Sequence, residues 1–167
     1  MILGLDSSTT VTGWAFSENN QIVDCGFIDT KKFVTTKEKT HHVISILEKN
    51  PLIKKITKIN LEAALSGFAS GFTRQQTVIL LARHNAVFAY IIEEHFKIQV
   101  NLLSVNTMRK KLFGKCRIKG VSSKDYVKLQ LEKTHPYIIK FCKTNKNGNP
   151  DIRNGDVYDA AVAALYN

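Results

Sequence analysis

Long apolar segments and paired cysteines are both missing from this sequence. No apolar run reaches the roughly 20 residues that a membrane-spanning helix needs. Cys25, Cys116 and Cys142 are far apart and form neither a CxxC pair nor a zinc-ligand spacing, so we expect free thiols in a reducing compartment. The first five residues lack a basic leader and run directly into Asp6, which is not typical of a signal peptide. We therefore expect an intracellular, cytoplasmic protein with no membrane partner.

Acidic residues are in the minority: 14 Asp and Glu stand against 24 Lys and Arg, a formal net charge of +10. Such an excess favours a polyanionic partner, nucleic acid before an anionic membrane surface. Residues 108–128 contain a basic block with a single acid, Asp125. Its cations are Arg109, Lys110, Lys111, Lys115, Arg117, Lys119, Lys124 and Lys128. A block of this kind is typical of a phosphate-binding surface, and charge that serves only solubility is the alternative.

The length of 167 residues and a hydrophobic content of 44% suit one folded domain over residues 1–167. The pattern predicts three strands at residues 2–6, 11–17 and 21–29, with Asn19 and Asn20 forming a hairpin turn. A helix at 37–49, a strand at 56–62, a long helix at 73–95 and a strand at 98–103 follow. Further helices are predicted at 105–113, from Ser122 to about 133, and at 156–166, with a polar loop at 145–154 before the last. This order predicts an α/β fold with a five-stranded mixed sheet, antiparallel in its first three strands and flanked by helices.

The long predicted helix is more apolar than one core requires. Ile79, Ala86 and Tyr90 widen its apolar stripe beyond a single face. This width indicates either a dimer interface or a helix that is buried on all sides.

Four carboxylates stand in or beside apolar segments, where an unpaired charge is costly. Asp6 and Glu62 each end a predicted strand, and Asp156 and Asp159 are three apart at the start of an apolar helix. Few cations are near them in the sequence, Arg153 being the nearest to the last pair. As isolated residues, Asp6 would suit a turn cap and Asp156 a helix N-terminus.

Together these four acids predict a metal site. Gathered carboxylates repel one another, and Mg²⁺ or Mn²⁺, which prefer oxygen ligands, would remove that repulsion. Two such ions can clamp a phosphodiester, one activating the attacking water and one stabilising the leaving oxygen.

Several motifs also resemble a known family. The sequence begins ILGLDSS, continues with TGWA at residues 12–15, has a strand that ends in Leu61 and Glu62, carries LAR at residues 81–83 and ends with DVYDAA at residues 156–161. These pieces resemble the RuvC-type Holliday junction resolvases of the ribonuclease H-like superfamily over essentially the whole chain. The small size and the abundance of Lys and Asn would suit a phage or viral form, which acts in the host cytoplasm.

The resemblance implies a ribonuclease H-like fold and a homodimer that cleaves four-way or other branched DNA, such as three-way or flap structures. It implies Mg²⁺, with Mn²⁺ as a substitute, and products that carry a 5′-phosphate and a 3′-hydroxyl. The family's four acidic positions fall on Asp6, Glu62, Asp156 and Asp159. Its two important basic positions fall on Arg109 and Lys124.

The sequence departs from the family at two places. Ser7 and Ser8 stand where Pro or Gly is frequent, and Leu65 stands where the family often has a residue that wedges into the junction. Phe68 and Phe72, in the same loop, either stack on unpaired bases or pack beneath the loop.

Two other functions remain open. One is a junction-binding protein of the same fold without turnover. The other is an actin-like nucleotide-binding fragment, although the chain has no P-loop and is too short for two such domains.

Overall fold

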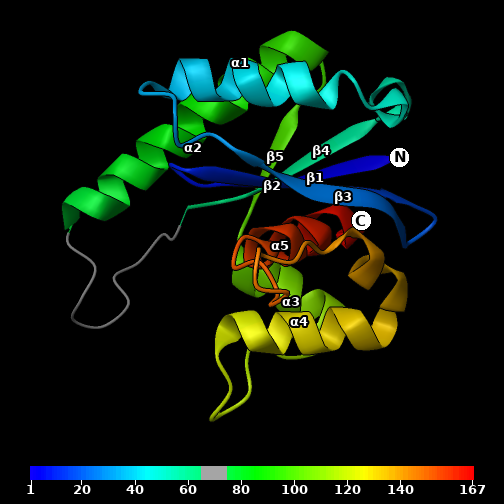
Figure 1. Ribbon diagram of the computed structural model, residues 1–167. Helices are drawn as coiled ribbons and strands as arrows, with labels where there is room; N and C mark the ends of the chain where they lie inside the picture. Colours follow the sequence, from blue (N-terminus) through cyan, green and yellow to red (C-terminus); the bar gives the residue numbers. More distant parts are fainter. Residues whose placement is uncertain (65–74) are drawn as a thin grey trace.

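Five strands form one mixed sheet through the middle of the molecule (Figure 1). The computed structural model describes residues 1–64 and 75–167. The strands are β1 (Ile2–Ser7), β2 (Val11–Glu18), β3 (Gln21–Asp29), β4 (Lys58–Glu62) and β5 (Val100–Leu103), in the order β3-β2-β1-β4-β5. The first three are antiparallel, whereas β4 runs parallel to both β1 and β5. The predicted mixed sheet, with its three antiparallel strands first, is therefore confirmed.

Helices cover both faces of this sheet (Figure 1). One face carries α1 (Thr36–Leu47) and α2 (Gln75–Phe96), and the other carries α3 (Val105–Phe113), α4 (Ser123–Thr134) and α5 (Asn154–Leu165). Because side chains alternate along a strand, Leu3 and Leu5 of β1 join the core under α1 and α2, while Gly4 lies against α5. The strands therefore have two different faces, and the acid at the end of β1 lies on the α5 face.

Short-range signals in the sequence explain most element boundaries. Asn19 and Asn20 have positive φ angles of 50° and 59°, which is the geometry of the predicted hairpin turn. Thr35 and Glu38 form a capping box, so α1 begins at Thr36, one residue before the predicted start. The side chain of Ser122 accepts a hydrogen bond from the amide of Asp125 and caps α4.

Some boundaries differ from the prediction. The 3₁₀ helices η1 (Pro51–Lys55) and η2 (Pro136–Phe141) were not expected, since Pro51 was interpreted only as the end of a helix. Strand β4 consequently begins at Lys58 rather than at residue 56. Strand β5 also begins later than predicted, at Val100 rather than at residue 98. The cap expected at Thr73 lies outside the described residues.

Helix α5 lies unusually close to the strands beneath it. A Cβ atom at Gly4 would come within 2.2 Å of the backbone of Ala160 and Ala164, and one at Gly13 within 2.0 Å of the carbonyl oxygen of Asp156. Only glycine permits such an approach at these positions. At the other end of α5, the buried amide of Asn60 donates hydrogen bonds to the carbonyls of Ala163 and Tyr166 at 2.9 and 2.7 Å. The sheet therefore fixes both the height and the position of α5.

The outer side of α2 exposes several large apolar side chains. Ile79 is 58% exposed, Leu80 57% and Tyr90 68%. The helix is thus not buried on all sides within this chain. In the described part of the chain, no helix combines the length and the hydrophobicity needed to cross a bilayer.

Candidate metal centre

Three of the four predicted acids meet at the carboxyl ends of the inner strands β1 and β4. Asp6, Glu62 and Asp159 each offer a carboxylate oxygen, and these oxygens all lie within 4.8 Å of one another. Strands β1 and β4 are parallel, with Leu5 paired to Leu61, so the acid that follows each of these residues lies beside the other. Helix α5 supplies Asp159 from above, because Gly4 and Gly13 let it approach the strands.

The fourth predicted acid, Asp156, stands at the rim of this group. Its side chain is 19% exposed, and its carboxylate accepts a hydrogen bond from the ammonium of Lys124 at 3.3 Å. Helix α5 begins at Asn154, two residues earlier than predicted, so Asp156 lies in its first turn and Asp159 one turn further along.

Burial and mutual repulsion raise the pKa values of the carboxylates in this group. Burial, and then the nearby Asp159 carboxylate, raise the pKa of Glu62 from 4.5 to about 8. Burial raises the pKa of Asp6 well above its usual range, and Glu62 and Asp159 raise it further. Among the described residues, Glu62 Oε2 is buried and has no hydrogen-bond partner. An oxygen-only donor set, crowded and incompletely satisfied, fits a hard divalent cation such as Mg²⁺ or Mn²⁺.

Two basic side chains, Arg109 and Lys124, come from distant parts of the sequence and contact these acids. The guanidinium of Arg109, in α3, donates to Asp159 at 2.7 Å, and both side chains are 8% exposed. Lys124, in α4, donates to Asp156. Burial lowers the pKa of Lys124, but the carboxylates of Asp156, Asp159 and Asp6 together raise it by more, so the pKa lies above its usual value. Asp156 and Asp159 therefore have basic partners in the structure, although few basic residues lie near them in the sequence. Arg153, the nearest in sequence, instead pairs with Asp29 and Asp151.

The predicted basic block does not form one uniform surface. Arg109 is 7% exposed, so it belongs to the interior of the acidic centre. Lys111 lies at the far end of α5, where its ammonium is 4.5 Å from the ring centre of Tyr166. Lys110, Lys115, Arg117, Lys119 and Lys124 are exposed. Leu65, Phe68 and Phe72 lie outside the described residues.

Two polar residues of α2, which the sequence analysis did not select, support the strand ends that carry the acids. His84 is 3% exposed and bonds through Nε2 to the hydroxyl of Ser7 at 3.0 Å and through Nδ1 to that of Thr36 at 3.1 Å. Asn85 is 6% exposed and donates to the carbonyl of Glu62 at 2.8 Å. The available signal was a run of three polar residues, Arg83, His84 and Asn85, between two apolar stretches of the helix.

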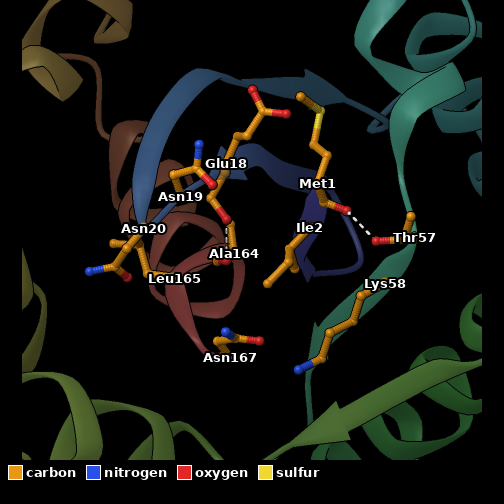
Figure 2. A pocket seen from close by; sticks show the side chains of 11 residues that line it. Met1, Ile2, Glu18, Asn19, Asn20, Thr57, Lys58, Ala164, Leu165 and Asn167 are labelled. Carbon is orange, nitrogen blue, oxygen red and sulfur yellow. Dashed lines mark hydrogen bonds between the residues drawn. The ribbon is translucent and has the colours of Figure 1, made fainter.

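A separate cavity of about 380 Å³ opens at the opposite end of β1 (Figure 2). Figure 2 shows Met1 and Ile2 facing Ala164 and Leu165, with Glu18 and Lys58 at its margin. Among the described residues, those that line the cavity include none of the acids of the metal centre, and Glu18 is their only acidic side chain. This cavity therefore lacks the chemistry of the acidic centre.

Sheet order, helical layers and the position of the acids together define a ribonuclease H-like fold. Within that class, the chain is similar to RuvC of Thermus thermophilus. One structure of that protein has a TM-score of 0.56 at 14% identity and covers 99% of this chain and 91% of its own. A second structure, of T. thermophilus RuvC in complex with a Holliday junction substrate, has a TM-score of 0.62 at 14% identity, with 99% and 90% covered.

Sequence comparisons add no closer relationship. No family model matches the chain, and no curated protein sequence matches it significantly. The structural likeness alone confirms, at the level of the fold, the resemblance to RuvC that the motifs suggested.

Proposed function

We propose that this protein is a metal-dependent endonuclease that cuts four-way or other branched DNA. The observation that carries the proposal is the convergence of Asp6, Glu62 and Asp159, whose oxygens lie within 4.8 Å of one another on a RuvC-like fold. A structure of the similar T. thermophilus protein contains a Holliday junction substrate, which supports branched DNA as the ligand. The net charge of +10 supports a polyanionic substrate independently.

Each acid has a distinct place in the proposed site. Asp6, Glu62 and Asp159 would hold one divalent cation, and Asp156 at the rim would help to hold a second beside the substrate. Bound Mg²⁺ or Mn²⁺ would supply an activated water and charge stabilisation for phosphodiester hydrolysis, leaving a 5′-phosphate and a 3′-hydroxyl. Burial raises the pKa of Asp159, and Arg109 opposes that rise and orients the carboxylate through their buried ion pair.

The DNA and the second protomer would use different surfaces. The exposed lysines and arginines of the basic block would bind phosphates, and Lys124 would stand where that surface meets the acids. The exposed apolar residues of α2 would form the interface of a homodimer, which could place two cutting sites on one junction.

A cleavage assay with a matched pair of variants tests the proposal. The wild-type protein should nick a synthetic four-way junction in Mg²⁺ and not in EDTA, with three-way and flap DNA as further substrates. Asp6→Asn should reduce cutting by about 10³-fold or more and retain junction binding, because it removes a metal ligand and keeps the shape. Asp24→Asn, on β3 and bonded to Asn50, is the control and should cut normally.

The outcomes separate the candidate functions. Cutting by Asp6→Asn at the wild-type rate would overturn the metal assignment. Tight junction binding by the wild type without any nicking in Mg²⁺ or Mn²⁺ would favour the junction-binding protein without turnover.

A further inference from the structure

A short hairpin precedes α5, in the segment where the sequence predicted only a polar loop. Thr144 and Pro150 form a β-bridge, and the amide of Asn145 donates to the carbonyl of Asn149 at 2.7 Å. The side-chain oxygen of Asn145 accepts hydrogen bonds from the amides of Asn147 and Asn149, which closes the tip. Residues 143–151 are named the α5 hairpin below.

Buried polar contacts tie the base of the α5 hairpin to the rest of the protein. Asn154, which is 4% exposed, donates to the carbonyl of Lys143 at 2.8 Å and accepts from its amide at 3.0 Å. The carboxylate of Asp151, 8% exposed, accepts three hydrogen bonds from Arg153. Arg153 also donates to Asp29 at 3.1 Å and lies 4.4 Å from the ring centre of Phe27 on β3. The chain on both sides of residue 152 is thus fixed.

Ile152 is nevertheless 90% exposed, more than any other large hydrophobic residue of the described chain. Its carbonyl accepts a hydrogen bond from the amide of Gly155, so its backbone belongs to the ordered approach to α5. An apolar side chain held in water on a fixed backbone gains nothing from burial within this chain. Rigid loops that present exposed side chains beside a reactive centre are typical binding elements.

Ile152 borders a cavity of about 240 Å³ between α4 and the α5 hairpin, and Lys124 and Lys128 of α4 also line it. Lys124 crosses directly over the backbone of Gly155, where an added Cβ would lie 3.0 Å from its ammonium, and reaches Asp156 at 3.3 Å. The cavity therefore opens next to the acidic centre, with Lys124 and Lys128 on one side and Ile152 on the other. Asp125 and Asp151 also line it, and their carboxylates bond to Ser122 and Arg153.

We propose that this cavity is a subsite for a single nucleotide next to the phosphate that is cut. Lys124 and Lys128 would face that nucleotide's phosphate, and Ile152 would pack against the face of its base. In a linear duplex each base face is covered by its neighbours, whereas a branch point leaves bases that can be unstacked. Ile152 is therefore a residue that selects branched over linear DNA, an inference that rests on the proposed function.

Binding measured by fluorescence anisotropy in Ca²⁺, without cleavage, tests the subsite. Ile152→Ser should weaken binding of a four-way junction about five- to tenfold and change binding of a linear duplex less than about twofold. Ile139→Ser is the matched control, because Ile139 is 54% exposed on η2, beyond the opposite end of α4 from Lys124. It should leave both affinities unchanged, and both variants should melt like the wild type.

A second variant tests the phosphate contact. Lys128→Ala should lower the slope of log affinity against log salt concentration by about one, the change expected when one phosphate contact is lost. Lys133→Ala, in the last turn of the same helix, should leave the slope unchanged.

The results distinguish failure of the subsite from failure of the function. Wild-type cleavage of the junction together with unaltered junction binding by Ile152→Ser overturns the subsite alone. An equal loss on junction and duplex overturns the assignment of branch selection to Ile152. A wild-type protein that neither binds nor cuts junctions overturns both proposals.

Discussion

The two faces of the sheet are packed in opposite ways. Under α1 and α2 the core consists of large side chains, among them Phe16, Phe88 and Ile92, which keep the helices at a normal distance from the strands. Under α5 the strands offer glycines and the helix offers Ala160, Ala161, Ala163 and Ala164, all fully buried. The first face buries larger side chains, and the second brings backbones together.

This difference explains where the acids converge. Short carboxylates from a strand and a helix share a cation only if the two backbones lie close to each other. The small residues of the α5 face provide that approach, while the large residues of the opposite face supply the stability that tolerates a crowded acidic centre. Changes on the two faces should therefore have different consequences.

The largest effect is expected from Gly4→Ala on the α5 face. The added Cβ would lie 2.2 Å from two backbone atoms of α5, so the helix must move. We expect a loss of more than about 3 kcal/mol in the free energy of unfolding. We expect Mn²⁺ to raise the melting temperature of the wild type, because a cation that binds only the folded state stabilises it. Among Gly4→Ala molecules that remain folded, this increase should disappear.

Gly155→Ala is the control for Gly4→Ala. Its Cβ would meet only the flexible end of Lys124, so its cost in urea unfolding should stay below about 1 kcal/mol. An equal loss for the two variants would contradict the close-packing argument.

A somewhat smaller loss of stability is expected from Leu5→Ala on the opposite face. Leu5 is fully buried under α1 and α2, and its truncation should cost about 3 kcal/mol in urea unfolding. At a temperature where the variant is folded, it should keep the wild-type increase in melting temperature with Mn²⁺. Loss of that increase would show that the two faces are not separable.

Asn85→Ala should cause a smaller loss of stability and should also affect the metal centre on the other face of the sheet. Asn85 reaches from α2 to the carbonyl of Glu62, so its removal should cost about 1–2 kcal/mol in urea unfolding. It should also raise the Mn²⁺ concentration needed for half-maximal stabilisation, because Glu62 is then held less firmly. Asn85→Asp keeps the size but not the donor and should not restore the metal affinity. A loss of stability with unchanged metal affinity would limit Asn85 to a structural role.

The stability of the metal-free protein should also depend on pH. Because the pKa of Glu62 is raised from 4.5 to about 8, the folded state holds this proton more tightly than the unfolded state. The resulting stability is present below about pH 4.5 and is lost as the pH rises towards about 8. Melting temperatures in EDTA should therefore fall across this range, less so in Glu62→Gln. Added Mg²⁺ should restore stability at the alkaline end.

Some parts of the site were accessible from the sequence because their signals are local. Asp6 and Glu62 follow apolar strand segments, and the spacing of Asp156 and Asp159 places both on one side of a helix. The sequence did not show that Asp159 is buried whereas Asp156 lies at the rim. This difference depends on Arg109 and Lys124, which lie 50 and 32 residues away from their partners. The roles of all four acids in catalysis remain predictions.

The sequence by itself determined the strand order along the chain, the hairpin at Asn19 and Asn20 and the candidate acids, because turns, caps and hydrophobic periodicity act over a few residues. Only the tertiary structure decided that α5 lies on Gly4 and Gly13, that Arg109 is buried with Asp159, and that Ile152 is held exposed beside Lys124. These relationships join residues that are distant along the chain. They follow from how closely the packed elements approach one another, which no local pattern records.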